Sequence, residues 1–352
     1  MSARRDRSVR TPSARASENC EKNVGRSDSL KLVHVIGALV AGGAERFVVS
    51  LLKRLKSDGM DVSLWALSNR LDRVGQDLEA ELARKAIPYE IGPTRRLGLA
   101  SVRWYAQLLA AKRPALVHLH TPNTELTHLL SSVATRTAFS RRTGALMRTI
   151  HNTEPPTSWI LRQAYRRKSA VCSIACGEAV AGSYANAVTG ELIHISNGVE
   201  FCGPIKSRQS KFVARDRLNL DHSAFHAVNI GRMSGSSLHD AQKAHDVMLQ
   251  GWRSSGLGQK AGVLHLLGDG NLRAQLEQLA NGDPSIRFHG VTGDTDAWLQ
   301  AADCFVMPSR FEGLPIAGLE AVGAGLPCIF SDIPPLRELS PPAALWCATA
   351  ES

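Results

Sequence analysis

Strand-like and helix-like segments alternate along most of this chain, and that alternation limits its possible folds more than any other feature. A strand is predicted at residues 32–36, followed by a glycine-rich turn at 37–43 and a helix at 44–57 whose apolar residues recur at helical spacing. The pattern continues with strands at 61–66, 116–120, 145–150, 171–175 and 192–195 and with helices that include 97–112 and 178–187. Such alternation predicts an α/β fold built on a parallel, doubly wound sheet.

A second alternating set follows the first. Its strands are predicted at 224–231, 261–268, 286–290, 304–307, 327–331 and 344–347, and its helices at 245–254, 272–280 and 295–301, with one more after Glu312. Between the two sets, the polar segment 203–222 lacks the apolar period of a strand. We therefore expect a domain at 30–202, a linker at 203–222 and a second domain at 223–352, and the length of 352 residues suits two domains.

The formal net charge of +10 is concentrated in two places. Arginines crowd the Ser-rich residues 1–29, which we expect to be a disordered basic tail because they lack the apolar region of a secretory signal. The second cluster consists of Arg162, Arg166, Arg167 and Lys168. No nucleic-acid reading module accompanies these residues, so the expected partner is an anionic membrane surface or a phosphorylated substrate, and a solvated basic face without a partner is the alternative.

The apolar runs and the cysteines indicate a chain of the reducing cytoplasm. No apolar run approaches the roughly 20 residues that span a bilayer, so we expect a soluble or peripheral protein. The seven cysteines are scattered, and the spacing Cys172-x3-Cys176 has no matching histidine ligands. They are therefore interpreted as reduced, mostly buried thiols, and no metal site is expected.

Two carboxylates, Glu312 and Glu320, stand eight positions apart across the expected start of a helix. Pro315 fits the first helical turn, where its missing N–H costs nothing, so the helix is predicted to open just after Glu312. The N–H groups at a helix start favour an anionic or hydroxyl-rich ligand. The pair can accept hydrogen bonds from two separated points of one ligand, such as a hexose and a ribose. The alternative is that both acids only cap a helix or face water.

Four features of the second half occur together, and similar motifs occur in the first half. In the second half they are Gly231-Arg232, Gln242-Lys243, Gly268-Asp-Gly270, and Glu312 and Glu320 with Gly313-Leu-Pro315. In the first half they are Gly42-Gly-Ala-Glu-Arg46, His120-Thr-Pro-Asn123, Thr149-Ile-His151 and Asn197-Gly-Val199. Over about residues 31–338 the ordered set resembles glycosyltransferase family 4, the retaining enzymes of GT-B fold, which implies two Rossmann-like domains facing a cleft.

The resemblance implies roles for the donor-side residues. Arg232 and Lys243 would clamp the diphosphate of a nucleotide sugar, because fixed cations stabilise that leaving group. Glu312, with the amides of Gly313 and Leu314, would touch the transferred hexose, and Glu320 would hold the ribose hydroxyls. The remaining implied donor-binding positions are glycines, where a substrate can approach the backbone closely: Gly42, Gly43 and Gly268.

Histidines carry the other implied roles. His120 would face the transferred sugar and hydrogen-bond a hydroxyl or orient the acceptor, and His118 competes for that role. His151 is a candidate on the acceptor side. The catalytic set is therefore His120, Arg232, Lys243 and Glu312. No carboxylate is assigned as a nucleophile, so the implied mechanism is front-face substitution, and without an Asp-x-Asp motif no metal or other cofactor is required beyond the nucleotide-sugar substrate.

The chain departs from the family pattern at three places. The loop Ser234-Gly-Ser-Ser-Leu-His-Asp240 is longer than usual, and Ala244 stands where glycine is common. After Glu338 only a strand and a few residues remain, so the usual C-terminal helices are expected to be missing and closure of the domains to be looser.

These features predict a retaining glycosyltransferase of polysaccharide biosynthesis. It would move a hexose from a nucleoside-diphosphate sugar, with UDP-sugars favoured, to a glycan or lipid-linked acceptor, in the cytoplasm at the inner face of the membrane. Two alternatives stay open: a nucleotide-sugar 2-epimerase of the same fold, and a weakly active or non-catalytic protein that binds sugar nucleotides.

Overall fold

The computed structural model describes residues 31–134, 145–156, 158–166, 170–200, 208–339 and 344–348. These residues form two compact units. The first comprises the described residues up to Val40 together with Ala44–Asn197, and the second comprises Ala41–Gly43 together with the described residues from Gly198 onward. The tail expected at 1–29 lies outside the described residues.

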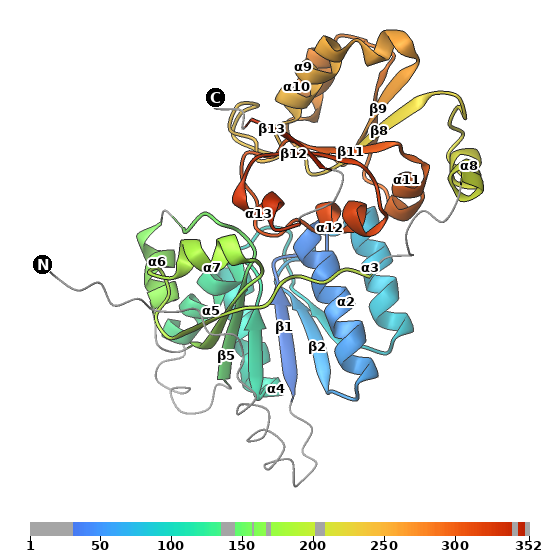
Figure 1. Ribbon diagram of the computed structural model, residues 1–352. Helices are drawn as coiled ribbons and strands as arrows, with labels where there is room; N and C mark the ends of the chain where they lie inside the picture. Colours follow the sequence, from blue (N-terminus) through green and yellow to red (C-terminus); the bar gives the residue numbers. More distant parts are fainter. Residues whose placement is uncertain are drawn as a thin grey trace, which may run out of the picture. The chain divides into compact units, whose positions relative to one another are not determined.

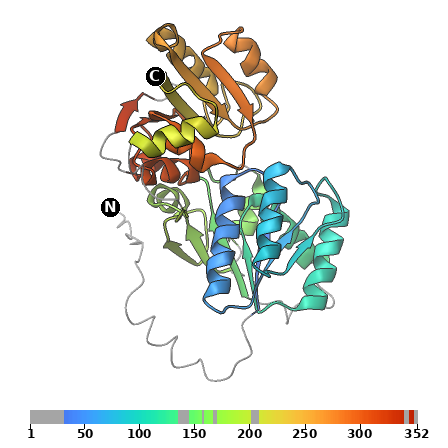
Figure 2. The ribbon, with the colours of Figure 1, turned by 90° about the vertical axis from the view of Figure 1, so that its right-hand side faces the viewer.

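The first unit is built on a seven-stranded parallel sheet with the order β3-β2-β1-β4-β5-β6-β7. Helices connect successive strands, and α2 and α3 lie side by side in both ribbon views (Figure 1 and Figure 2). The elements are β1 (Leu32–Ile36), α2 (Gly43–Ser57), β2 (Val62–Ala66), α3 (Arg73–Arg84), β3 (Tyr89–Ile91), α4 (Leu99–Lys112), β4 (Leu116–Leu119), α5 (Pro122–Ala134), β5 (Ala145–Ile150), α6 (Trp159–Arg166), β6 (Ala170–Ala175), α7 (Glu178–Tyr184) and β7 (Glu191–His194).

The strand order of the first sheet reverses between β1 and β4, which lie next to each other. Ligands of open parallel sheets bind beyond the carboxyl ends of the strands at such a point. Gly37 follows β1 there, His120 follows β4, and His151 follows the next strand, β5. The start of the predicted glycine-rich turn and two of the predicted motif histidines therefore lie at one edge of the first sheet.

The second unit is built on a six-stranded parallel sheet with the order β10-β9-β8-β11-β12-β13. Here the order reverses between β8 and β11. The elements are α8 (Arg208–Arg217), β8 (Phe225–Ile230), α9 (His245–Ser255), the 3-10 helix η1 (Leu257–Lys260), β9 (Gly262–Leu267), α10 (Arg273–Ala280), β10 (Ile286–Gly290), α11 (Thr295–Ala301), β11 (Cys304–Met307), α12 (Ile316–Gly323), β12 (Cys328–Ser331), α13 (Pro334–Arg337) and β13 (Ala344–Cys347).

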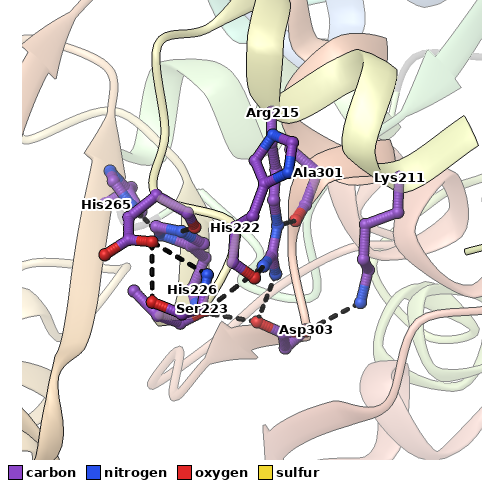
Figure 3. Close-up of polar contacts among 10 residues, drawn as sticks. Lys211, Arg215, His222, Ser223, His226, His265, Ala301 and Asp303 are labelled. Atoms are coloured by element: carbon purple, nitrogen blue, oxygen red, sulfur yellow. Dashed lines mark hydrogen bonds and ion pairs between the residues drawn. The ribbon is translucent and has the colours of Figure 1, made fainter. Parts of the chain in front are cut away.

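Part of the segment predicted as a linker, 203–222, forms helix α8 of the second unit. Ala214 and Leu220 join that unit's apolar core. Arg215 is only 3% exposed, and it donates to Asp303 Oδ2 at 2.7 Å and to the carbonyl of Ala301 at 3.0 Å (Figure 3). Ion pairs and a few apolar contacts hold α8 against the rest of the unit. Its sequence therefore lacks the run of apolar residues at helical spacing from which a helix is predicted.

The sequence predicted most strands of both sheets to within one or two residues. It missed α3, which begins where Asp72 accepts a hydrogen bond from the amide of Gly75 at 2.8 Å, and the three-residue edge strand β3. Short edge strands give little periodicity to read. No helix among the described residues combines the length and the apolar character needed to cross a membrane.

Candidate active site

Glycines hold the loops after β8 and β9 against each other in the second unit. Gly268 has φ +139°, and a Cβ at this position would overlap the carbonyl oxygen of Gly231. A Cβ on Gly270 would likewise overlap the carbonyl oxygen of Met233. The amide of Met233 donates to Asp269 O at 3.0 Å. The glycines predicted at these loops are therefore required for their close approach.

Lys243 and Glu312 meet beside these loops. Lys243 Nζ lies 2.6 Å from Glu312 Oε1, and the side chains are 15% and 5% exposed. The stem of Lys243 runs over Gly231, since a methyl group there would lie 3.1 Å from Lys243 Cγ. Lys243 comes from the loop that follows β8, and Glu312 from the loop that follows β11. Two residues predicted from separate motifs thus form one ion pair where the strand order of the second sheet reverses.

Gln242 completes the environment of the carboxylate. Its Nε2 donates to Glu312 Oε2 at 3.0 Å, so each oxygen of Glu312 accepts a hydrogen bond from a different side chain. Carboxylate oxygens can accept more than one hydrogen bond each. Contacts at both oxygens therefore fix Glu312 in orientation.

Arg310 and Asp246 brace the pair of Lys243 and Glu312, and neither residue was predicted as a site residue from the sequence. The guanidinium of Arg310 donates to both oxygens of Asp246, at 3.1 and 2.9 Å, and to Ala241 O at 3.0 Å. The amide of Arg310 donates to Gln242 O at 2.8 Å. These bonds join the segment that precedes Glu312 to the segment that carries Lys243. Arg310 stands in the motif with Glu312, but its partner lies 64 positions away, so spacing could not reveal it.

The long loop 234–240 is anchored from a neighbouring loop. Asn271 Nδ2 donates to Gly235 O at 2.9 Å, and Gly235 N donates to Asn271 Oδ1 at 3.3 Å. At the end of this region, Ala244 adopts φ 46° and ψ 44°, the left-handed conformation that favours glycine. Glycine, the residue expected here from the resemblance, would adopt this conformation without the strain that the Cβ of Ala244 causes.

The other predicted donor-side residues of the second unit are close in sequence to Lys243 or to Glu312. Arg232 is exposed, Gly313 and Leu314 are buried, and Glu320 is half-buried on α12. The predicted place of Pro315 in the first helical turn needs correction. Helix α12 begins at Ile316, and Pro315 precedes it with ψ 122°, which is extended backbone.

In the N-terminal glycine motif, Gly42 is half-buried and Gly43 is the exposed first residue of α2.

In the first unit, the predicted histidines lie in a cluster of four rings. His120 Nε2 lies 2.9 Å from His34 Nδ1, and His120 Nδ1 lies 3.4 Å from His151 Nε2. The ring of His118 lies 4.1 Å from that of His120, measured between centroids. Both nitrogens of His120 thus face other imidazoles, and the side chain is 1% exposed. His34 could not be predicted as a member of the cluster, because a histidine inside an apolar strand resembles an ordinary core position.

Burial keeps these imidazoles neutral. It lowers the pKa of His34 to about 3 and that of His151 to about 4, and it lowers the pKa of His118 and His120 well below 6.5, with further lowering by neighbouring histidines. A neutral imidazole offers one N–H donor and one acceptor nitrogen. The cluster can therefore pass hydrogen bonds along its rings or present lone pairs to a ligand.

Comparisons with known proteins agree with the geometry. Residues 41–201 match the family described as Glycosyltransferase Family 4, and residues 227–347 match the family described as Glycosyl transferases group 1. EpsF of Bacillus subtilis (strain 168), which is named as a glycosyltransferase, is 26% identical over 92% of this chain and 87% of that protein.

Two further proteins extend this likeness. An Escherichia coli protein named UDP-Gal:alpha-D-GlcNAc-diphosphoundecaprenol alpha-1,3-galactosyltransferase is 40% identical over 20% of this chain and 19% of that protein. The crystal structure of HepE from Anabaena in complex with UDP-glucose superposes with a TM-score of 0.70 at 17% identity, covering 91% of this chain and 86% of that chain. At that identity the superposition shows a shared fold.

Proposed function

Because the chain belongs to the family 4 and group 1 glycosyltransferases of GT-B fold, we propose that it moves a hexose from a UDP-sugar to a glycan or lipid-linked acceptor in polysaccharide biosynthesis, with retention at the anomeric carbon. The observation that carries this proposal is the pair of Lys243 and Glu312 at the reversal of the second sheet. A cation and a carboxylate fixed side by side suit a donor whose diphosphate and hexose are adjacent groups.

Lys243 serves the diphosphate without leaving Glu312. An ammonium group carries three N–H donors, and the contact with Glu312 uses one of them. The others can reach phosphate oxygens, where a fixed positive charge stabilises the departing diphosphate. Arg232 adds a second cation, and the amides of Gly313 and Leu314 approach the hexose together with Glu312. Glu320, further along α12, takes the ribose hydroxyls.

The reaction needs no covalent intermediate with a carboxylate. The bond from the anomeric carbon to the diphosphate oxygen breaks while the acceptor oxygen forms a bond on the same face. The leaving diphosphate accepts the proton of the acceptor hydroxyl. Glu312 fits a holding role in this scheme, because Lys243 and Gln242 already fix both of its oxygens. His120 and His151 are proposed to act on the sugar and acceptor side.

The donor and acceptor classes draw support from the similar proteins. The HepE structure contains UDP-glucose, and the Escherichia coli enzyme is named for a UDP-sugar and a diphosphoundecaprenol-linked acceptor. A lipid-linked acceptor would place the reaction at the cytoplasmic face of a membrane. On α6, Trp159 is 69% exposed and Ile160 is 39% exposed, beside Arg162 and Arg166. Apolar and basic side chains together suit an anionic membrane surface. Arg167 and Lys168 lie outside the described residues.

A donor panel tests the proposal. A set of UDP- and GDP-sugars is incubated with the full chain, with and without membrane lipid extract as acceptor, and the release of UDP or GDP is measured. We expect release from at least one UDP-sugar and a loss of about 100-fold in Lys243→Ala, the size seen when one electrostatic contact to a transition state is removed. No release from any donor would overturn the proposal.

A matched lysine in the same unit supplies the control. Lys211 Nζ lies 2.7 Å from Asp303 Oδ1, an ion pair between α8 and the residue that precedes β11 (Figure 3). Asp303 keeps Arg215 as a partner when Lys211 is removed. Lys211→Ala should therefore retain the wild-type rate. If UDP-N-acetylglucosamine without acceptor gave its 2-epimer, the epimerase alternative would replace transfer.

A further inference from the structure

Three histidines of the first unit are close enough to share one metal ion. One ring nitrogen from each of His34, His118 and His120 lies within 4.8 Å of the other two, and all three side chains are buried. In the part of the chain that the structure describes, this is the one group of three histidine, cysteine or acidic side chains that satisfies such a criterion. The cluster lies in the first unit, whereas Lys243 and Glu312 belong to the second.

The sheet itself brings the three rings together. His34 on β1 pairs in register with His118 on the adjacent strand β4. His120 comes two positions after His118, just beyond the end of β4, and its amide still donates to Val35 O on β1 at 3.2 Å. Residues two apart along an extended strand project from the same face. The rings therefore converge because of strand pairing where the sheet order reverses, and not through a mobile loop.

Neighbouring groups hold the outer nitrogens of two rings. Thr149 Oγ1 lies 2.7 Å from His118 Nε2, and His151 Nε2 lies 3.4 Å from His120 Nδ1. The other two ring nitrogens are His118 Nδ1 and His120 Nε2, and a shared ion would replace the contact of 2.9 Å between His120 Nε2 and His34 Nδ1. Histidines that bind metals usually hydrogen-bond through the other ring nitrogen in this way, which fixes the ring and its tautomer.

His34 has a ring nitrogen with no partner. Its Nδ1 faces His120 Nε2 at 2.9 Å, while its Nε2 is buried and makes no hydrogen bond within the described chain. A buried polar atom without a partner costs free energy, and a bound ion is one of its recognised explanations.

The donor set specifies the class of ion. Because burial lowers the pKa of each ring, the imidazoles are neutral and keep the lone pairs that a metal requires. Three imidazoles without a thiolate suit zinc and similar divalent transition metals, and three protein ligands leave a fourth position open. Water, hydroxide or another anion at that position would offset part of the buried charge.

We propose that His34, His118 and His120 bind one divalent transition-metal ion of the zinc class, with a fourth coordination position open to water or an anion. The site shares His120 with the sugar side of the proposed transfer reaction, whereas the donor contacts of that reaction at Lys243 and Glu312 lie in the other unit.

Cobalt is the probe that tests coordination directly. The full chain without a histidine tag is freed of metal with a chelator and titrated with Co²⁺, whose visible absorption is strong in tetrahedral sites and weak in octahedral ones. We expect one equivalent to give the tetrahedral spectrum and Zn²⁺ to displace it. A wild-type chain that gives no tetrahedral band, or that binds only in octahedral form, overturns the proposal whatever the variants do.

Variants assign the ligands. His34→Gln should abolish the tetrahedral band, and Thr149→Val, which keeps the shape of the side chain, should weaken binding by about 10-fold or more because it releases the outer nitrogen of His118. The control is His265→Gln. His265 lies between His226 and His289 at 2.9 Å from each in the second unit, in a series of rings that does not meet the criterion above.

The outcomes separate this proposal from glycosyl transfer. His265→Gln should bind Co²⁺ like the wild type. Equal binding in His34→Gln, or loss of binding in His265→Gln, would place the metal elsewhere and overturn the assignment. Metal content and spectrum are read without any sugar donor, so the result is independent of the donor panel.

Discussion

Lys243 and Glu312 stand 69 positions apart in sequence, yet their charged atoms lie 2.6 Å apart in a largely buried setting. They reach each other because β8 and β11 are neighbours in the second sheet, and each residue follows one of these strands. The carboxylate and the ammonium group are therefore positioned before any ligand arrives. Groups positioned in advance need little reorganisation during a reaction.

Removing the charge of Lys243 should lower the unfolding free energy, because the buried Glu312 loses its counterion. Lys243→Met keeps an apolar stem over Gly231 but leaves the carboxylate with Gln242 as the remaining partner described above. We expect a loss of about 3 kcal/mol in the unfolding free energy of the second unit, because a buried charge loses its counterion. Urea unfolding, followed separately for each transition, measures this loss.

The double variant Lys243→Met with Glu312→Gln tests whether the two side chains are coupled. It should be more stable than the sum of the single changes predicts, by about 1–3 kcal/mol. Lys211→Met is the comparison, with a loss below about 1 kcal/mol expected because its pair with Asp303 is more exposed. Additive single effects would contradict a direct interaction.

Replacing Arg310 by lysine should lower both the stability of the second unit and the rate of donor turnover. The guanidinium of Arg310 donates to both oxygens of Asp246, and the two side chains are 10% and 11% exposed. The single ammonium group of a lysine cannot reproduce this two-point contact. Arg310→Lys is expected to lower the unfolding free energy by about 2 kcal/mol. It should also slow donor turnover about 10-fold or more, because the braced loops position Lys243 and Glu312.

A surface arginine provides the matched control for Arg310. Arg337 also donates two hydrogen bonds to one carboxylate, that of Asp332, at 2.6 and 2.8 Å, but both side chains are 50% exposed. Arg337→Lys should cost less than about 1 kcal/mol and leave turnover unchanged. Equal effects of the two substitutions, in urea unfolding and in diphosphate release, would show that Arg310 does not brace the site.

Glycine at position 244 should be tolerated better than at an ordinary buried position. Ala244 has φ 46°, and a Cβ in this conformation costs about 1–2 kcal/mol, which Ala244→Gly would relieve. Ala321, fully buried within α12, has no such strain, so Ala321→Gly should cost about 1 kcal/mol. Thermal unfolding should rank Ala244→Gly as the more stable variant by at least about 1 kcal/mol. The reverse order would contradict the left-handed conformation.

Stability should fall as the pH is lowered below about 6.5, the ordinary pKa of histidine. Burial and the nearby Lys243 lower the pKa of His245 to about 4. Burial, followed by the neighbouring His289 and His226 and by Arg287, lowers the pKa of His265 to about 3. The unfolded chain then binds more protons than the folded one, so the stabilisation is present above pH 6.5 and is lost as the pH falls toward those values.

Each of these histidines should remove about 1.4 kcal/mol of stability at pH 5.5. Urea unfolding at several pH values measures the profile. His245→Gln removes one titrating group, so its profile should be shallower by about 1.4 kcal/mol per pH unit between the two pKa values. Parallel profiles for the variant and the wild type would show that His245 does not lose protons on folding.

The strands and most helices could be predicted because their information is local. Leu32–Ile36 and Cys304–Met307 are short apolar runs bounded by turn residues, and both are strands with the predicted bounds. Helix α8 could not be predicted, because Arg215 attaches it through Asp303, 88 positions away. A long-range ion pair leaves no period in the sequence.

The sequence by itself determined the alternating α/β pattern, the glycine turns and the motifs that contain Lys243 and Glu312, because each depends on residues close together in the chain. The tertiary structure alone decided that these two side chains pair, that Arg310 reaches Asp246, and that His34 joins His118 and His120. The physical reason is strand order: hydrogen bonding between β8 and β11, and between β1 and β4, brings together residues whose separation in sequence says nothing about their distance in space.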